Sequence, residues 1–376
     1  MTYGISHSLM STYVATHYRT HTLGEIQSNG AELVDKEVTV AGFMEANRGK
    51  GAICFVDLRD GTGKTQIFLK GDNVGDEALD MVQRMTREST LQFTGTVSQK
   101  RPPKTKEGEP TPPPAYEVVA SSVTLIARAE APLPLGVTDT VHVALDTRLD
   151  NRFLDLRRAH VAAMFRLRGK VLQYGREALI NEGFFETHTP KIVATATEGG
   201  TDLFPMKYFD IPAFLNQSPQ LFKQLCMSGG LERVFEIGPA FRAEKHDTYR
   251  HLNEFISFDI ECSWSTDEDV MGVLERMIYH MWDCVSKDEE SQQHIATINQ
   301  YRATQGEEPV EVIVPELPFP RVSYCDAIDI IKKKGGEIEW GDDIDAENSG
   351  LLAEDLPHFY FLPRWPMALK PFYIHH

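Results

Sequence analysis

The chain has 376 residues, a formal net charge of −17 at pH 7 and a hydrophobic content of 41%. Its length suits two domains rather than one, and the absence of any run of about 18 apolar residues excludes a membrane-spanning helix. The five cysteines are scattered and form neither a CxxC pair nor a disulfide framework. The N-terminus has no basic start followed by an apolar segment, so we expect a cytoplasmic protein with no membrane partner.

The acidic charge is distributed unevenly along the chain. Residues 1–130 contain 14 Lys and Arg against 16 Asp and Glu, a net charge of −2, which leaves −15 for the remainder. The first part of the chain therefore repels a polyanion such as a nucleic acid less than the second part does.

Five β-rich runs in the first part predict a small barrel. They read EVTVAGFM, AICFVDLRD, TQIFLK, STLQFTGTVS and YEVVASSVTLIA. A helix is expected at Asp76–Thr86, between the third and fourth runs, where a five-stranded Greek-key barrel of the OB type carries its helix. We therefore expect an OB-fold barrel over residues 22–128, preceded by an N-terminal extension of residues 1–21.

Two segments of the barrel need separate interpretation. DGTGKTQ is similar to the end of a phosphate-binding P-loop, but Leu58 stands where that motif requires glycine. Because β-rich runs flank the segment on both sides, it is interpreted as the turn of a hairpin. RPPKTKEGEPTPPPAY, residues 101–116, is expected to project as a loop between two strands because it contains six prolines. It is either an inert insertion or a loop near bound nucleic acid.

A linker at residues 129–150 leads to a second domain over residues 151–376. After LDNRFLDLRR, an amphipathic helix is expected from His160 to Asn181 and is capped by Gly183, because apolar residues recur every three or four positions. These apolar residues are Met164, Leu167, Val171, Tyr174 and Ala178.

Strand-like runs separate this helix from a second one. FFETHTPKIV reads as a strand broken by Pro190, and RVFEIGPAFRAE and EFISFDIECSW read as two further strands. The second helix starts at a capping box, Ser265 to Glu268. Its apolar residues are Val270, Leu274, Met277 and Met281. The pattern predicts an α+β domain in which helices flank an antiparallel sheet.

Two segments of this domain are suited to the charged groups of a small ligand. Glu198 precedes two glycines, and a carboxylate on such a loop suits a cationic amine. Ser218 and Pro219 have the residue types of an N-cap and a first helical residue, and the first turn then places Gln220 and Lys223 on one face. That turn favours an anion such as a carboxylate. The alternatives are an exposed loop glutamate and an ordinary surface helix start.

The stretch FRAEKHDTYRHLNEF gathers cations within an acidic domain. On an antiparallel hairpin, Arg242 and Glu244 project from one face, where arginine can bind a phosphate and glutamate can accept a base amino group. Arg250 and His251 are placed to reach the distal phosphates, and Phe255 to stack on a base. The alternative is a salt-bridged surface hairpin.

These segments together resemble the class II aminoacyl-tRNA synthetases, and among them the aspartyl-tRNA synthetases of the archaeal/eukaryotic-like type. FFETHTP with the helix before it is similar to motif 1 of the family, and FRAE with RHLNEF is similar to motif 2. ATEGGTDLFPMKYF and QSPQLFKQ are similar to the aspartate-binding segments, and RFLDLRR to the start of the catalytic domain. The resemblance implies a homodimer through motif 1, with Pro190 as the motif proline.

The resemblance also implies a reaction. ATP, bound with Mg²⁺, and L-aspartate would give aspartyl-adenylate and pyrophosphate, and the aspartyl group would pass to the 3′ end of tRNA(Asp). Arg242 would be the catalytic residue, because it would bridge the α-phosphate and the aspartate carboxylate. The implied ATP-binding residues are Arg242, Ala243, Glu244, Arg250, His251, Leu252 and Phe255. The implied aspartate-binding residues are Glu198, Ser218, Gln220, Lys223 and Arg242.

Lys223 favours aspartate over the substrates of related enzymes. A lysine pairs with the side-chain carboxylate of aspartate, whereas asparagine would leave it desolvated and unpaired, a difference that discriminates by roughly 10⁴-fold. Asparaginyl enzymes lack this lysine, and lysyl enzymes need an acidic pocket. An asparaginyl-tRNA synthetase is kept as an alternative function.

Three barrel residues match the anticodon-binding residues of the family: Arg48, Phe55 and Gln66. Phe55 would stack on an anticodon base and Gln66 would read the edge of a base; the alternative for Phe55 is a place in the barrel core. Strict archaeal-type enzymes carry a tryptophan where this chain, aligned without gaps, has Glu45. This difference favours relaxed specificity that includes tRNA(Asn).

The pattern of the family continues beyond KPFYIHH, the last residues of this chain. The later segments would supply acidic Mg²⁺ ligands and motif 3, so no metal ligand is expected among the residues present. We expect either a fragment of an ordinary enzyme or a chain that is inactive unless a partner supplies the rest. A further alternative is a catalytically inactive, synthetase-like RNA-binding protein.

Overall fold

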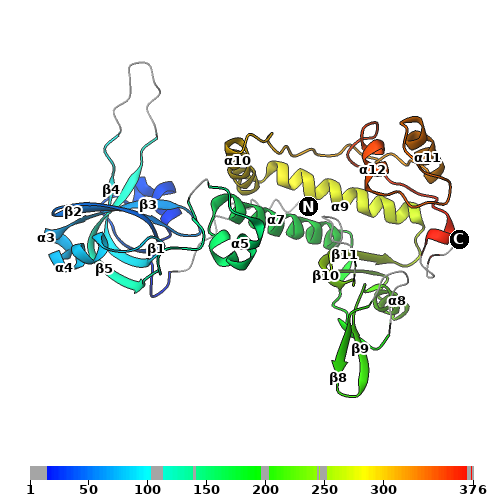
Figure 1. Cartoon of the computed structure of the whole chain (residues 1–376), viewed down its shortest axis with the longest axis horizontal. Coiled ribbons are helices and arrows are strands. Elements are labelled where there is room, and N and C mark those ends of the chain that lie inside the picture. The colour runs from blue at the N-terminus through cyan, green and yellow to red at the C-terminus, as the bar shows by residue number, and fades with distance from the viewer. Residues whose placement is uncertain are drawn as a thin grey trace, which may run out of the picture. The chain divides into compact units, whose positions relative to one another are not determined.

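The computed structural model describes residues 15–102, 113–138, 141–195, 203–243, 245, 252–370 and 374. The chain divides into two compact units, Met1–Arg158 and Ala159–His376. The first unit contains a closed barrel, and the second contains two small sheets with helices (Figure 1). The predicted α+β fold with an N-terminal barrel is therefore confirmed.

The barrel consists of five strands in the order β1-β2-β3-β5-β4. Their bounds are β1 Glu37–Lys50, β2 Ile53–Arg59, β3 Lys64–Lys70, β4 Thr90–Gln99 and β5 Tyr116–Ala127. Every second side chain of β2 is apolar and points inward, so that Cys54, Val56 and Leu58 are fully buried. Each predicted run forms one strand, and β1 continues past Met44 to Lys50.

Asp60 holds the turn between β2 and β3. Its carboxylate accepts hydrogen bonds from the backbone N–H groups of Thr62 at 2.7 Å and Gly63 at 3.1 Å. The strands on either side pair antiparallel. The predicted hairpin at DGTGKTQ is therefore confirmed, and a P-loop is excluded because a strand rather than a helix follows the turn.

The proline-rich segment joins two neighbouring strands, as predicted. β4 and β5 pair antiparallel, with Gln99 opposite Tyr116 at that end. Residues 103–112 of this segment lie outside the described residues, as do residues 1–14 of the predicted N-terminal extension.

The helices of the first unit are α1 Leu23–Ser28, α2 Gly30–Leu33, α3 Gly71–Val74, α4 Asp76–Gln83, α5 Leu145–Asp150 and α6 Arg152–Asp155. α4 is the helix predicted between the third and fourth strands, although it ends at Gln83 rather than Thr86. α5 lies within the segment predicted as a linker. It is ordered because the fully buried Asp155 accepts hydrogen bonds from Arg148 at 2.9 Å and Arg152 at 2.7 Å.

The second unit contains two three-stranded sheets. In the first, β10 Arg233–Phe241 pairs antiparallel with β11 Glu254–Cys262 and parallel with the short β6 Phe185–Glu186. In the second, β9 Ile211–Leu215 lies between β7 Ile192–Val193 and β8 Pro205–Tyr208. FFETHTPKIV therefore forms two short strands in different sheets. The predicted break at Pro190 separates them, because proline cannot donate a ladder hydrogen bond.

Helices α7 Ala159–Asn181 and α9 Asp267–Lys287 lie side by side against the first sheet (Figure 1). Their shared core consists of Ala178, Leu179, Phe184, Phe235, Val273 and Met277. Gly175 permits this packing, because a Cβ there would lie 2.6 Å from the ring of Phe258. α7 ends at Asn181, and Gly183 follows it with φ +82°, as predicted for a glycine cap.

Two details of these helices differ from prediction. Met164 is 43% exposed, so it does not belong to the buried face of α7. The capping box of α9 is one residue later than expected, because the Thr266 hydroxyl accepts the Asp269 N–H while the Ser265 hydroxyl donates to the carbonyl of Ser263.

The remaining helices of the second unit are α8 Gln220–Ser228, α10 Glu289–Thr304, α11 Tyr324–Lys333, α12 Ala346–Ala353 and the 3₁₀ helix Met367–Leu369. α11 and α12 form a separate core around Tyr324, Ile331 and Leu352. Within the part of the chain that the structure describes, no helix is both long enough and apolar enough to cross a membrane.

Candidate active site and nucleic-acid interface

The start of α8 is held by a serine hydroxyl. Ser218 Oγ accepts a hydrogen bond from the N–H of Gln220 at 3.1 Å, and Lys223 N–H donates to the carbonyl of Pro219 at 2.9 Å. The N-cap position is Pro219 rather than the predicted Ser218, since α8 begins at Gln220. Proline has no side-chain acceptor, so the hydroxyl before it satisfies the open N–H group.

The buried Lys223 lies in a charge cluster with two partly buried carboxylates of β11. Its side chain is 7% exposed, and its Nζ lies 3.2 Å from Asp259 Oδ1 and 3.4 Å from Glu261 Oε2. Nζ also donates to the carbonyl of Ile260 at 3.2 Å. Gln220 Nε2 donates to the same Glu261 carboxylate at 3.1 Å. Gln220 and Lys223 therefore share one face of α8, as their spacing predicts.

The cluster matches the charges of an amino acid. A buried ammonium needs a paired anion, and a buried carboxylate needs a paired cation or donor. One lysine beside two carboxylates offers a partner to a ligand carboxylate and a partner to a ligand ammonium. Asp259 and Glu261 were not among the predicted site residues. Their alternation in β11 places them on one face of the strand, but the sequence pattern does not show that α8 packs over that face.

Arg242 follows the end of β10 and contacts Phe255 of β11. The backbone N–H of Arg242 donates to the carbonyl of Asn253 at 3.0 Å, and its guanidinium carbon lies 5.3 Å from the Phe255 ring centroid. This distance is that of a cation–π contact. Ala243 and Phe255 are half-buried, and Leu252 is 58% exposed. The predicted residues Glu198, Glu244, Arg250 and His251 lie outside the described residues.

A buried glutamate connects β10 to the segment around Pro190. Glu236 is 2% exposed, and its carboxylate accepts hydrogen bonds from the Thr189 hydroxyl at 2.7 Å and the Thr189 N–H at 3.2 Å. Its other oxygen pairs with Lys191 at 2.5 Å. The charge of Glu236 is therefore compensated inside the protein, and the Pro190 segment is fixed to the strand that leads to Arg242.

No metal site is formed by the described residues. They contain no group of three or more His, Cys, Asp or Glu side chains placed to hold a metal ion. Asp259 and Glu261 share Lys223 instead, so this pair does not fit a divalent cation as it stands.

The outer face of the barrel brings the three predicted anticodon residues together. Arg48 is opposite Phe55 in the β1–β2 register, and Phe55 is opposite Phe68 in the β2–β3 register. Phe55 is half-exposed between the buried Cys54 and Val56, so the alternative that it belongs to the core is wrong. The Phe55 and Phe68 rings lie 5.0 Å apart. They form a partly exposed aromatic platform of the kind on which bases stack.

Polar side chains border this platform on both sides. Arg48 donates two hydrogen bonds to Asp57, at 2.7 and 3.1 Å, and these raise the pKa of the guanidinium. Burial would raise the pKa of the Asp57 carboxyl, but the Arg48 hydrogen bond and the charges of Lys64 and Lys100 hold it below its ordinary value. Gln66 donates to Glu117 at 2.6 Å and accepts from Lys100 at 3.1 Å.

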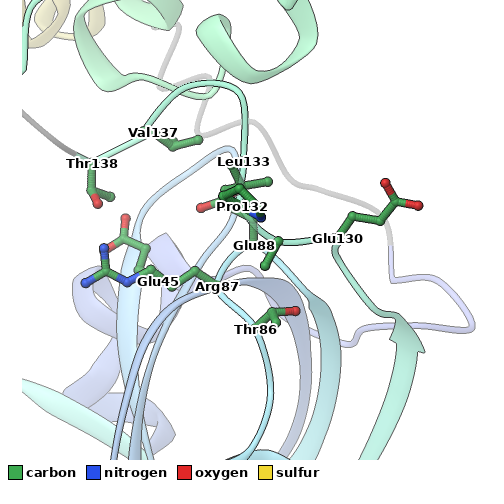
Figure 2. Close-up of a pocket in the computed structure, with 11 residues that line it drawn as sticks. Glu45, Thr86, Arg87, Glu88, Glu130, Pro132, Leu133, Val137 and Thr138 are labelled. Carbon is green, nitrogen blue, oxygen red and sulfur yellow. The ribbon is translucent and has the colours of Figure 1, made fainter.

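Glu45 is the extra residue of a β-bulge between β1 and β2. It pairs with Arg59 at 2.8 Å and with Lys64 at 2.5 Å, and it lines a pocket of 320 Å³ in the first unit. Figure 2 shows Glu45 and Thr138 on one side of this pocket, while the carboxylate of Glu130 points away from it. The other buried carboxylate of its wall, Glu88, is also bound by Arg59.

Two family profiles match the chain. One, described as "tRNA synthetases class II (D, K and N)", matches residues 144–376, and the other, described as "OB-fold nucleic acid binding domain", matches residues 38–126. The second match confirms the OB type of the barrel. A protein of Archaeoglobus fulgidus named "Aspartate--tRNA(Asp/Asn) ligase" is 44% identical over 342 residues, which cover 91% of this chain and 75% of that protein.

Among the solved structures that are similar over most of the chain are two synthetases. The first is a putative aspartyl-tRNA synthetase of Leishmania major, with a TM-score of 0.78, 27% identity and coverage of 97% of this chain and 77% of that one. The second is an asparaginyl-tRNA synthetase of Pyrococcus horikoshii complexed with asparaginyl-adenylate, with a TM-score of 0.75, 31% identity and coverage of 92% and 74%. Both alignments span both units of this chain.

Proposed function

We propose that this chain, which belongs to the class II tRNA synthetases of the D, K and N group, is an aspartate–tRNA ligase. It activates L-aspartate with ATP and transfers the aspartyl group to the 3′ end of tRNA(Asp). The observation that carries this proposal is Lys223, a buried ammonium at the start of α8. It pairs with the side-chain carboxylate of aspartate, and an amide in that place would leave the charge uncompensated.

The charge cluster orients the amino acid for the first step. The substrate ammonium is held by Asp259 and Glu261, with Glu198 as a further carboxylate, and its side-chain carboxylate by Lys223 with Ser218 and Gln220. The α-carboxylate then attacks the α-phosphate of ATP in line, a P–O bond forms, and pyrophosphate leaves. Arg242 stabilises the charge that develops at this phosphate, which makes it the catalytic residue.

The hairpin around β10 and β11 binds ATP in this proposal. Phe255 stacks on adenine. The cation–π contact between Arg242 and Phe255 keeps the Arg242 guanidinium over the Phe255 ring. The other ATP-binding residues are Ala243, Glu244, Arg250, His251 and Leu252. Mg²⁺ neutralises phosphate charge in such reactions when it is bound. Within the described part of the chain, no group of three or more acidic, His or Cys side chains is placed to hold this ion.

The barrel binds the anticodon, and the enzyme acts in the cytoplasm as a homodimer. Phe55 and Phe68 give stacking area, while Arg48 and Gln66 lie beside them with donors for bases or phosphates. The bulge residue Glu45 stands where strict enzymes of the family carry a tryptophan, which favours acceptance of tRNA(Asn) beside tRNA(Asp). Pro190 and its neighbouring strands, with Phe185 and Ile192 more than half exposed, supply the dimer surface.

ATP–pyrophosphate exchange tests the amino-acid assignment. We expect exchange that depends on L-aspartate and none with L-asparagine or L-lysine. Exchange with asparagine would assign the chain to the asparaginyl enzymes. If the chain binds RNA but shows neither exchange nor binding of any of these amino acids, it belongs to the inactive synthetase-like proteins. Aspartylation of purified tRNA(Asp) and tRNA(Asn) then measures the tRNA specificity, with both expected to be charged.

A further inference from the structure

Asn216 joins three segments that are far apart in the sequence. It follows β9 and is fully buried. Its backbone N–H donates to the carbonyl of Lys191 at 2.9 Å, and its carbonyl accepts the N–H of Phe241 at 3.0 Å. The backbone of Asn216 thus lies between the segment after Pro190 and the end of β10, one residue before Arg242.

The side chain of Asn216 donates one hydrogen bond and accepts another within the described residues. Its Nδ2 donates to the carbonyl of Pro190 at 3.0 Å, and its Oδ1 accepts the backbone N–H of Ser218 at 3.2 Å. The two partners fix the orientation of the amide, since a carbonyl only accepts and an N–H only donates. Because the residue is 0% exposed, water does not replace either bond if the side chain is removed.

These bonds continue into the amino-acid site. Ser218, held by Asn216 through its N–H, holds the N–H of Gln220 through its hydroxyl. Three residues later, Lys223 meets Asp259 and Glu261. The start of α8 is therefore connected to the Pro190 segment through one amide side chain.

We propose that Asn216 is a positioning residue that fixes the first turn of α8, and with it the ammonium of Lys223, for the side-chain carboxylate of the amino acid. This role rests on the proposed function. Asn216 touches no substrate itself, and its effect on binding passes through Ser218 and Lys223.

Bonds from another residue also hold the Pro190 segment. Glu236 binds Thr189 and Lys191 independently, so the Pro190 segment stays attached to β10 when the Asn216 amide is lost. The backbone bonds of Asn216 also remain after substitution. Removal of the side chain therefore loosens Ser218 in particular, and the defect is expected in amino-acid binding rather than in ATP binding.

Asn216→Ala tests the proposal by calorimetric titration of the whole chain. We expect L-aspartate to bind roughly five- to tenfold more weakly, the equivalent of one lost buried hydrogen bond, while ATP binding changes less than about twofold. Asn348→Ala is the matched control, because Asn348 is also a buried asparagine but lies in α12. Unchanged aspartate binding, or equal weakening for both ligands, would overturn the proposal.

Asn216→Asp separates positioning from general loosening by its pH dependence. The carboxylate keeps the acceptor for Ser218 but loses the donor to Pro190, and burial raises the pKa of such a carboxyl. On acidification from about pH 8.5 to about pH 6, protonation restores a donor, so aspartate affinity should recover toward that of the unmodified chain. Asn216→Ala should show no recovery. A defect in Asn216→Asp that is independent of pH counts against the role of the Pro190 bond.

Hydrogen exchange provides a measurement that does not depend on any ligand. In Asn216→Ala the amides of Ser218 and Gln220 should exchange faster, while Asn348→Ala leaves them unchanged. If the unmodified chain binds no aspartate, the proposed function fails, and the exchange data still decide whether Asn216 fixes α8. Equal exchange at Ser218 and Gln220 in all three proteins would refute that.

Discussion

The barrel face and the charge cluster of α8 are built in opposite ways. On the barrel, Arg48, Phe55 and Gln66 lie on adjacent antiparallel strands and are brought together by neighbouring hairpins. In the second unit, Lys223 meets Asp259 across 36 positions of sequence. The barrel side chains are half-exposed, whereas Lys223 is almost completely buried.

This difference determines what each region tolerates. An exposed ion pair such as Arg48–Asp57 contributes about 0–1 kcal/mol, because water solvates either partner when the other is lost. Water does not solvate a buried lysine in this way, so loss of its carboxylate partner leaves an uncompensated charge. We therefore expect the barrel face to tolerate single substitutions in its stability, and the α8 cluster to respond strongly in both stability and binding.

The largest effect is expected from Lys223→Leu. The substitution removes the only cation that Asp259 and Glu261 share among the described contacts, so aspartate binding should weaken by about 100-fold or more. Calorimetric titration with L-aspartate measures this loss.

Lys170→Leu is the matched control for that experiment. Lys170 also pairs with two carboxylates, Asp288 and Glu290, but it lies on α7. It should lose stability without a specific loss of aspartate binding. Equal effects of the two substitutions on aspartate affinity would contradict the role assigned to Lys223.

Phe55→Ala should have the next largest effect, and only on RNA. Loss of one base–aromatic stack costs about 1–3 kcal/mol, so an anticodon stem-loop of tRNA(Asp) should bind roughly 10- to 100-fold more weakly. Fluorescence anisotropy with the labelled stem-loop measures the affinity, and aspartate binding should not change. Trp264→Ala serves as control, since Trp264 is 91% exposed in the other unit. A similar loss in both variants would remove the argument for a specific platform.

Asp57→Asn should have the smallest effect, below about 1 kcal/mol in the free energy of unfolding of the barrel. The folded-state pKa of Asp57 lies below its ordinary value of 3.8. Its contribution is therefore fully present above pH 3.8 and is lost as the pH falls through the lower folded pKa. Urea unfolding at neutral and acid pH should show the two proteins converge on acidification. Asp72→Asn, an exposed pair with Lys70, should behave like the unmodified protein throughout. A difference at neutral pH that persists in acid would exclude the ion pair as its cause.

The barrel and part of the second unit could be predicted from local patterns, whereas β8, β9 and the helices after α9 were not predicted. The five strands, the helix after β3, the hairpin at DGTGKTQ and the glycine cap of α7 all follow from periodicity and turn chemistry. Helix starts were less exact. The N-caps of α8 and α9 were predicted at Ser218 and Ser265, one residue before their actual positions. The position of a cap depends on the direction in which the chain enters the helix. Met164 has the spacing of the apolar residues of α7, but it is exposed because no other segment among the described residues covers it.

The candidate site was only partly predictable. Gln220 and Lys223 follow from helical spacing, whereas Phe55 and Gln66 were predicted from the resemblance to the family. Asp259 and Glu261 were missed because their meaning depends on the helix that packs over them. Asn216 gave no signal, because an asparagine after a strand reads as an ordinary turn residue.

The sequence by itself determined the two units, the barrel and the residue types available for chemistry, because these depend on contacts between near neighbours along the chain. The tertiary structure decided that Lys223 is shared by two carboxylates, that Phe55 points outward beside Phe68, and that one buried amide joins Pro190 to Ser218. Such pairings depend on which segments meet in space. An unpaired polar group costs more free energy in a buried site than in water. The contacts between these segments therefore decide which residues act together.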